Sequence, residues 1–234
     1  MNSILSKVRN FLNCQKRSWK RAEAVFNKAY YKNSWGSRES ASGTGSELAQ
    51  TRVLVEKLPG ILKDLGVTSF LDLPCGDLNW MAQVDLGGIR YIGSDIVAPI
   101  IENNIKKFAG SGREFTRLNL IIDDLPEANL IFCRDCLVHL SNSDIFKALA
   151  NISRSGIRYL ATTTFTSRKE NPDIPTGCWR PINLQASPFS LPSPLLLLNE
   201  GCTEAGGLYD DKCLGVWSVA DLPIHQNSSC REQK

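Results

Sequence analysis

The 234-residue sequence lacks any long hydrophobic run, and this absence limits the classes of protein it can belong to. No apolar stretch approaches the roughly 20 residues that a membrane-spanning helix needs. The first twenty residues contain neither a continuous apolar segment nor a small-residue cleavage site, so they make a poor secretory signal. We therefore expect no transmembrane segment and a cytoplasmic location.

The sequence also lacks the cysteine spacing of a disulfide framework or a zinc site. Its eight cysteines are scattered, and two fall in apolar, strand-like runs, which suits buried reduced thiols. Cys133, Cys136 and His139 are candidate zinc ligands, but no second ligand pair accompanies them. Positions 133 and 136 would moreover face opposite sides of a strand. We expect no metal site.

Composition and charge indicate one soluble domain with a basic N-terminal segment. Apolar residues make up 42% of the chain and charged residues 22%, as in ordinary globular proteins. The length suffices for one full core but not for two ordinary domains. Residues 1–32 hold eight Lys or Arg and one Glu, whereas the whole chain has a net charge of +3. Such a basic segment either packs over the domain, which we favour, or docks on nucleic acid or an anionic membrane.

Hydrophobic periodicity in this basic segment predicts two short amphipathic helices, over residues 4–12 and 19–30. A glycine- and serine-rich loop follows over residues 34–46, and Ser46 is a candidate cap for the next helix. The loop either folds over a ligand or merely connects two helices. We treat residues 1–46 as one unit of basic helices and loop.

Beyond this unit, short apolar strands alternate with helices. We predict strands over residues 67–73, 90–94, 129–133 and 158–164, and helices near 98–108 and 142–153. This alternation is typical of an α/β, doubly wound and mostly parallel sheet with helices on both faces. Residues 195–198 and 212–219 then predict a C-terminal antiparallel hairpin.

A proline-rich insert interrupts the pattern. Residues 166–194 hold six of the eleven prolines, so they cannot form a regular helix or a central strand. Long irregular segments in compact domains are usually functional or disordered. We assign residues 47–224, insert included, to the ligand-binding domain, and residues 225–234 to a flexible tail.

The most informative motif is FLDLPCGDLNW, over residues 70–80. A strand ends at Asp72, a tight turn through Pro74 and Gly76 follows, and Asp77 opens the next element. Doubly wound folds bind ligands outside the carboxyl ends of their strands, so this turn faces the expected pocket. Gly76 lets the backbone approach a ligand closely. An alternative role for Asp77 is to cap the following helix.

A second carboxylate follows at an informative distance. Asp95 ends the next strand, 19 residues beyond Gly76, and an acidic residue at this spacing is placed to accept the ribose hydroxyls of an adenosine ligand. The turn carries two aspartates and no G-x-G-x-x-G pattern, which opposes the pyrophosphate of a nicotinamide dinucleotide. S-adenosylmethionine has a cationic sulfonium, an ammonium and no phosphate, so carboxylates attract it.

At this point FLDLPCGDLNWM, YIGSDI and IFCRDCLVHLS together resemble the class I S-adenosylmethionine-dependent methyltransferases. More narrowly, they resemble a subfamily whose first motif is D-x-P-C-G-D. The similarity extends over nearly the whole chain past residue 30, through TTTF, TGCWRPINLQ and LGVWSVADL. It implies a Rossmann-like sheet of seven strands.

The resemblance also implies a set of cofactor contacts. The turn residues Asp72, Pro74, Gly76 and Asp77 would hold the methionine end. Asp95 and Ile96 would hold the ribose. Asn119 and Leu120 would lie against the adenine, although many family members carry aspartate where Asn119 stands; its carbonyl can still accept from the adenine amino group, but without charge. Cys133 and Arg134 would lie near the reactive methyl group.

Candidate catalytic residues follow the fourth strand. Methyl transfer mainly requires alignment, and a general base where the acceptor must lose a proton. Asp135 is our first candidate base and His139 the second, because His139 could instead pack beneath the next helix. Arg134 either clamps an acidic acceptor or pairs with Asp135.

The acceptor is less well defined by the sequence. Trp35, Trp179 and Arg180 are candidates to stack on it or grip it, or the insert is a packed lid without contacts. The N/D-P-P-Y signature of base-methylating relatives is absent, and so is a catalytic Pro-Cys pair. We favour a small-molecule or glycan-like acceptor. The alternatives are a nucleic-acid methyltransferase that uses the basic segment, a non-catalytic cofactor-binding module, and a disfavoured nicotinamide-dependent oxidoreductase.

Overall fold

A computed structural model describes residues 19–110 and 112–223. The helix predicted over residues 4–12 and the tail predicted over 225–234 lie outside the described residues. The second predicted N-terminal helix is confirmed, because residues 19–31 are helical.

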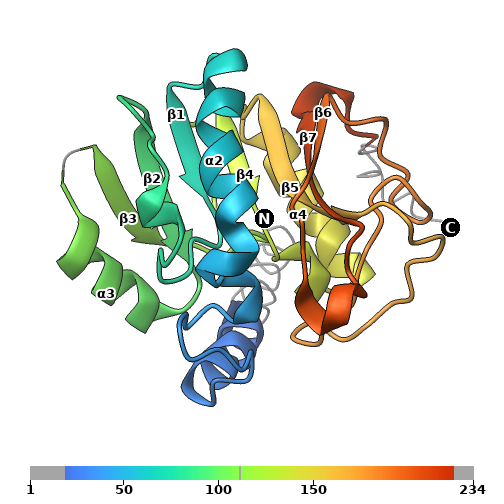
Figure 1. The fold of residues 1–234 in the computed structure, drawn as a ribbon, viewed down its shortest axis with the longest axis horizontal. Coiled ribbons are helices and arrows are strands. Elements are labelled where there is room, and N and C mark those ends of the chain that lie inside the picture. Colours follow the sequence, from blue (N-terminus) through green and yellow to red (C-terminus); the bar gives the residue numbers. More distant parts are fainter. Residues whose placement is uncertain (1–18, 111, 224–234) are drawn as a thin grey trace, which may run out of the picture.

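The core of the molecule is a seven-stranded sheet in the order β3-β2-β1-β4-β5-β7-β6 (Figure 1). The strands are β1 (Ser69–Asp72), β2 (Arg90–Asp95), β3 (Arg113–Arg117), β4 (Leu130–Cys133), β5 (Tyr159–Phe165), β6 (Leu196–Asn199) and β7 (Lys212–Ser218). The first five strands pair in parallel, and β7 pairs antiparallel with both β5 and β6. The predicted α/β class, the strand number and the C-terminal antiparallel hairpin are confirmed.

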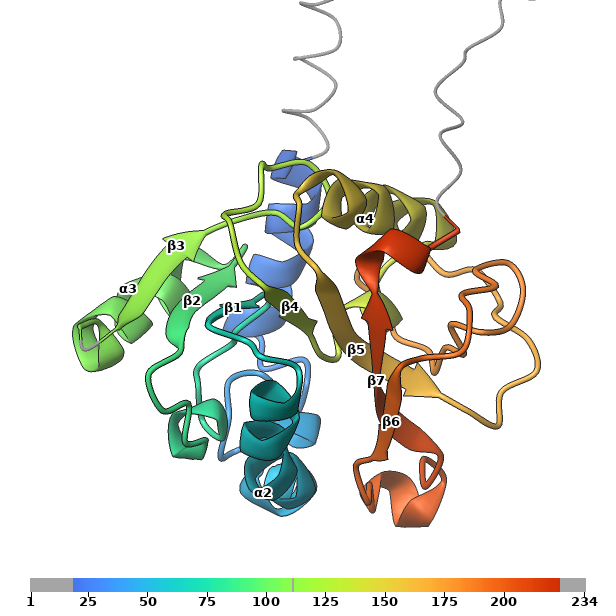
Figure 2. The same ribbon diagram turned by 90° about the horizontal axis from the view of Figure 1, so that it is seen from above.

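Helices cover both faces of this sheet. Helices α2 (Leu48–Asp64) and α4 (Asn142–Arg154) lie on opposite sides of it (Figure 2). Helix α3 (Ala98–Phe108) packs beside β2 and β3. The sheet is therefore wound on both sides, as the strand–helix alternation predicted.

The alternation of side chains along the strands produces two apolar cores. In β1, Phe70 joins the core under α2, with Leu54 and Leu58, while its neighbour Leu71 joins the core under α4, with Leu149. Successive strand residues point to opposite faces, and both faces are covered here. The short strands β1 and β4 therefore read as nearly continuous apolar runs, SFLD and LIFC, in the sequence.

Two local expectations need correction. The residue that caps α2 is Glu47, and Ser46 instead ends the short 3-10 helix η1 (Thr44–Ser46). No α-helix connects β1 to β2; the 3-10 turn η2 (Met81–Gln83) is the helical element between them. Asp77 therefore caps no helix.

None of the helices in the described ranges is long and apolar enough to cross a membrane.

The N-terminal helix is fastened to the loop side of the sheet. Trp19 donates its indole N–H to Asp123 at 3.0 Å, and the guanidinium of Arg117 stacks on the Trp19 ring at 4.1 Å. Arg117 also pairs with Glu23 of this helix. A cation–π contact reinforced by an ion pair fixes the helix where Ala22 and Phe26 reach the cavity described below.

Close packing of Gly215 in β7 gives a test of the fold. An added Cβ there would lie 2.3 Å from the indole of buried Trp217, so we expect Gly215→Ala to lower the free energy of unfolding by about 1–3 kcal/mol. Gly60→Ala is the control, because that Cβ would meet nothing within 4 Å inside α2 and should stabilise by up to about 1 kcal/mol. Urea unfolding measures both; equal effects would contradict the packing described.

Candidate functional site

The turn after β1 is held at the carboxyl edge of the sheet by two backbone hydrogen bonds. The N–H of Leu73 donates to Phe132 of β4, and the N–H of Cys75 donates to Ser94 of β2. Gly76 follows with a φ of +55°, a conformation that favours glycine. A Cβ at Gly76 would also lie 2.0 Å from the hydroxyl oxygen of Ser42. The predicted need for glycine at this turn therefore has two physical causes.

The glycine- and serine-rich loop folds back onto this turn. The Asp77 carboxylate accepts hydrogen bonds from the Ser40 hydroxyl at 2.8 Å and from the Ala41 N–H at 2.7 Å. The Ser42 hydroxyl in turn accepts from the Asp77 N–H at 3.2 Å. Asp77 holds the loop over the sheet edge and does not itself line the cavity beneath it.

The main cavity opens at the carboxyl ends of β1, β2 and β4, beneath the loop and the N-terminal helix. The empty space between its walls, open solvent included, is about 1040 Å³. Eleven of the fifteen residues predicted for the site line it: Trp35, Asp72, Pro74, Gly76, Asp95, Ile96, Asn119, Leu120, Arg134, Asp135 and His139. The remaining four are Asp77, Cys133, Trp179 and Arg180.

Two buried carboxylates dominate the β1–β2 side of the main cavity. Asp72 accepts the Tyr91 hydroxyl at 2.6 Å, and burial raises its pKa to about 8 against the opposing effect of that hydrogen bond. Asp95 accepts the N–H groups of Val97 at 2.9 Å and Gly76 at 3.2 Å, and burial raises its pKa to about 6. Among the described residues neither carboxylate forms an ion pair. At pH 7 Asp95 is therefore mostly ionised and Asp72 mostly protonated in the free protein, and a positively charged ligand beside them would favour the ionised form of both.

Asn119 presents a donor to the same cavity. Its side-chain oxygen accepts the Ile121 N–H at 2.9 Å, which fixes the orientation of the amide. Its amide nitrogen is buried and has no hydrogen-bond partner among the described residues. A buried unpaired donor at a cavity wall calls for an acceptor on a ligand. The carbonyl contact expected from the sequence is thus partly taken by the backbone.

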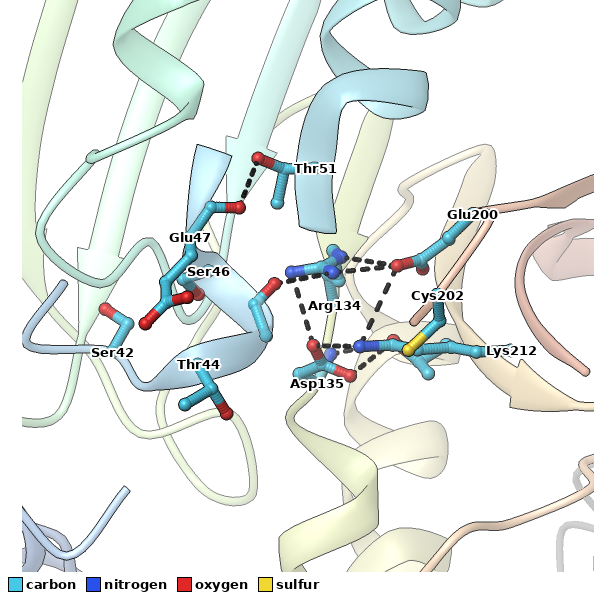
Figure 3. Close-up of polar contacts among 12 residues, drawn as sticks. Ser42, Thr44, Ser46, Glu47, Thr51, Arg134, Asp135, Glu200, Cys202 and Lys212 are labelled. Carbon is cyan, nitrogen blue, oxygen red and sulfur yellow. Dashed lines mark hydrogen bonds and ion pairs between the residues drawn. The ribbon is translucent and has the colours of Figure 1, made fainter. Parts of the chain in front are cut away.

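A second charged cluster lies at the end of β4 (Figure 3). Arg134 donates to the Glu200 carboxylate at 2.7 Å and lies 3.2 Å from Asp135. Lys212 contacts the same carboxylate oxygen of Asp135, Oδ2, at 2.7 Å. Although burial of Arg134 opposes its charge, the neighbouring carboxylates raise its pKa. Of the two roles considered for Arg134, pairing with Asp135 is the one observed.

These cations also determine the state of Asp135. Burial acts to raise the pKa of Asp135, but Lys212 and Arg134 outweigh it and hold that pKa well below its usual range. Asp135 also has a φ of +51°, which is rare outside glycine and is found at functional sites. A carboxylate held this strongly ionised makes a weak general base but a strong hydrogen-bond acceptor.

His139 has the better geometry for a base. It belongs to the 3-10 turn η3 (Leu137–His139), and its Nδ1 lies 2.9 Å from the carbonyl oxygen of Cys178. A carbonyl only accepts, so Nδ1 bears the proton and Nε2 keeps its lone pair. Burial lowers the pKa of His139, which keeps the ring neutral at pH 7.

The proline-rich insert is irregular, as predicted, and it is bonded to η3. Arg180 donates to the carbonyl of Leu140 at 2.8 Å and to the side chain of Asn142 at 2.6 Å, and it is buried. Arg180 lines neither cavity and is structural. Cys133 is likewise fully buried in β4 and lines neither cavity. Trp179, by contrast, lines a side cavity next to the main one.

The sequence interpretation missed three charged residues near the site: Lys212 and Glu204, which line the side cavity, and Glu200, which pairs with Arg134. Glu200, Lys212 and Glu204 come from the end of β6, the start of β7 and the loop between them. The hairpin was predicted, but a sequence gives no signal that its charged residues cross to the end of β4. Among the described residues no group of histidine, cysteine and carboxylate side chains could hold a metal ion.

The raised pKa of Asp72 predicts a pH-dependent cost in stability. Its folded-state pKa of about 8 exceeds the unfolded value near 4, so the folded chain binds this proton more tightly and loses stability as pH rises from about 4 to 8. We expect Asp72→Asn to be more stable than wild type at pH 8 by on the order of a few kcal/mol, and much less so at pH 5. Urea unfolding at both pH values measures this, with exposed Asp124→Asn as the control. A variant less stable at both would refute the assignment.

The tautomer of His139 can be observed directly by NMR. The chain contains two histidines, so only two sets of imidazole signals need to be assigned. We expect long-range ¹⁵N imidazole spectra to show a neutral ring protonated at Nδ1 and a pKa below the ordinary 6.5. The His225→Gln variant identifies the signals. A proton on Nε2, or a pKa above 6.5, would contradict the geometry.

Comparison with known proteins places the fold but not the family. No protein-family profile matches the chain, and no curated protein matches its sequence. Solved structures of methyltransferases do match. The N-methyltransferase NodS from Bradyrhizobium japonicum WM9 aligns with a TM-score of 0.53 at 12% identity, over 73% of this chain and 96% of that one.

Two further matches cover less of the molecule. NodS in complex with S-adenosyl-L-homocysteine aligns with a TM-score of 0.42 at 16% identity, over 50% of this chain and 60% of that one. The methyltransferase domain of bacterial CtHen1-C gives 0.43 at 14% identity, over 50% and 66%. The alignment with a TM-score of 0.53 shows that the chain has the Rossmann-like fold of a methyltransferase; at 12% identity it shows the fold alone.

Proposed function

We propose that the chain is an S-adenosylmethionine-dependent methyltransferase of the type with a D-x-P-C-G-D first motif, and that the main cavity binds the cofactor. The observation that carries this proposal is the pair of buried carboxylates, Asp72 and Asp95, without an ion pair among the described residues. A sulfonium nucleoside would place a positive charge beside the ionised Asp95 and would favour loss of the proton from Asp72. A nicotinamide dinucleotide would instead bring a pyrophosphate against two aspartates.

The donor set of the main cavity fits the cofactor group by group. Asp72 and the Gly76 turn would hold the charged methionine end, and Asp95 with Ile96 would hold the ribose hydroxyls. The unpaired amide nitrogen of Asn119 fits a ring nitrogen of adenine, which is a hydrogen-bond acceptor. Leu120 is buried at the cavity wall and offers an apolar surface to the same ring.

Two residues at the junction of the cavities would act on the acceptor. When bound, S-adenosylmethionine supplies an electrophilic methyl group on a cationic sulfur. His139 would remove a proton from the acceptor through Nε2, and Asp135 would orient the acceptor by a charge-assisted hydrogen bond. This reverses the order of preference drawn from the sequence, because Asp135 is held ionised by two cations whereas His139 is held neutral.

The fold match supports the cofactor assignment. NodS, whose fold this chain shares, has been crystallised in complex with S-adenosyl-L-homocysteine. We retain a small-molecule or glycan-like acceptor ahead of nucleic acid, because carboxylates at the cavity junction oppose phosphate. A cytoplasmic location remains our expectation.

Calorimetry with S-adenosyl-L-methionine and S-adenosyl-L-homocysteine tests the proposal. We expect wild type to bind both, and Asp95→Ala to lose on the order of 2 kcal/mol because a charged bidentate contact to the ribose is removed. Asp124→Ala, a change at an exposed aspartate that lines neither cavity, is the matched control.

The possible outcomes separate the assignments. Equal affinity of wild type and Asp95→Ala would show that Asp95 is not the ribose partner. Absence of binding by folded wild type would sink the proposed function as a whole, and tight binding of NAD would replace it with the oxidoreductase alternative.

A further inference from the structure

The side cavity adjoins the main cavity at the place where the acceptor must enter. The two cavities share Trp35, Ser42, Asp135 and His139 as wall residues. A molecule in the side cavity would therefore reach His139 and the reacting end of a cofactor in the main cavity. The residues that line the side cavity therefore indicate which class of acceptor it can bind. This inference depends on the proposed function.

One wall of the side cavity is aromatic. Trp179 packs edge-on against Tyr209, with ring centroids 5.1 Å apart, and both contact Phe165. Trp179 is still 41% exposed, which is unusual for so large an apolar side chain. Its free surface provides a face on which an organic ligand can stack and to which a cation is attracted.

The charged part of the wall has no cation to spare. Lys212 has an exposed side-chain fraction of 4%, and its ammonium lies 2.7 Å from Asp135, 3.8 Å from Glu200 and 3.9 Å from Glu204. Arg134 is equally buried and is paired with Glu200 and Asp135. The cluster thus holds two cations and three carboxylates, a net charge of −1.

A hydrogen bond holds the carboxylate of Glu204 at the wall of the side cavity. Its carboxylate accepts the Thr44 hydroxyl at 2.7 Å, and Glu204 belongs to the 3-10 turn η4 (Glu204–Gly207) between β6 and β7. The next residue, Ala205, has a φ of +50°, in the left-handed region that non-glycine residues seldom adopt. The loop therefore keeps a partly exposed carboxylate at the cavity at some cost in backbone strain.

From this cavity we infer that the methyl acceptor is an organic amine, bound as its ammonium in the side cavity. An ammonium would bring the local net charge to zero, would meet the ionised carboxylates of Asp135 and Glu204, and would lie near the Trp179 face. A carboxylate or phosphate acceptor would meet the net negative charge instead. A neutral hydroxyl acceptor would leave that charge uncompensated.

The same arrangement accounts for the proton balance. The ammonium nitrogen gives one proton to His139 Nε2 and becomes a neutral amine. Its lone pair then forms a C–N bond to the methyl carbon as the C–S bond breaks, and the electron pair of that bond stays on sulfur. The methylated nitrogen carries the positive charge, and His139 returns its proton to water.

Binding of a matched probe series tests the inference without knowledge of the natural acceptor. Benzylamine, benzyl alcohol and benzoate share one ring and differ in the terminal group. Their affinities for the protein saturated with S-adenosyl-L-homocysteine are measured by ligand-observed NMR. We expect benzylamine to bind at least about tenfold more tightly than benzyl alcohol, and benzoate to bind most weakly.

Variants separate charge recognition from stacking. Glu204→Gln should remove most of the preference for the amine while leaving the alcohol unchanged, whereas Trp179→Ala should weaken the amine and the alcohol alike. Glu102→Gln is the control for loss of a carboxylate, because Glu102 is an exposed residue of α3 that lines neither cavity.

Each outcome decides the inference. Equal affinities for amine and alcohol, a preference for benzoate, or a preference that survives Glu204→Gln would overturn it. S-adenosyl-L-homocysteine binding is measured first in the same samples. If it binds while the amine shows no preference, the acceptor class is wrong and the proposed function stands; if it does not bind, the proposed function itself fails.

Discussion

The burial of two carboxylates at one edge of the sheet is the constraint on which the site depends. Asp72 and Asp95 end adjacent parallel strands, and the register pairs Asp72 with Gly93, so both side chains emerge at the same cavity. Hydrogen bonds from Tyr91 and from backbone N–H groups offset part of the cost of burial, but the pKa values stay raised. The fold tolerates this arrangement because two large apolar cores stabilise it elsewhere.

The charged cluster at the end of β4 follows a different rule. There Arg134 and Lys212 are buried with carboxylates around them, so each charge has a partner and the group is rigid. Arg134 and Asp135 directly follow β4, Glu200 directly follows β6, and Lys212 begins β7. The cluster therefore ties the antiparallel hairpin to the parallel part of the sheet. Breaking one pair would leave a buried charge uncompensated, which is far more costly than losing a surface pair. The protonation state of Asp72 in the main cavity can therefore change near neutral pH, whereas the ionised state of Asp135 in the cluster cannot.

The sequence predicted well those features that depend on local pattern. Strands β1, β2, β4 and β5 are buried on both faces and were predicted from their apolar residues, and α3 and α4 show helical periodicity. Strand β3 was not located, because this edge strand is REFTR and none of its residues is fully buried. No apolar run marks such a strand. Its place is set by pairing with β2, which is a long-range property.

The residues of the candidate site divide in the same way. Asp72, Gly76 and Asp95 were found because strand ends and turns are visible in sequence, and the topology brings them to one edge. Asp77 and Arg180 were predicted to contact ligands, but they bind protein instead: Asp77 holds the serine-rich loop, and Arg180 holds the insert. Residue type alone does not distinguish a ligand contact from a buried internal partner. That distinction depends on which loop covers which strand end.

The movement of positive charge during methyl transfer would link the two cavities. In the proposed reaction a positive charge leaves the sulfur in the main cavity and reappears on the acceptor nitrogen in the side cavity. The carboxylates of the main cavity lose their electrostatic partner at that moment, while Asp135 and Glu204 keep theirs. Because burial raises the pKa of Asp72 to about 8, the main cavity can respond by taking up a proton at neutral pH. The ionised cluster cannot respond in that way, because Lys212 and Arg134 hold the pKa of Asp135 far below neutrality. Under the proposed function, the unequal proton affinity of the two carboxylate groups would give them different tasks: Asp72 would adapt to the loss of charge, and Asp135 would maintain a fixed field for the acceptor.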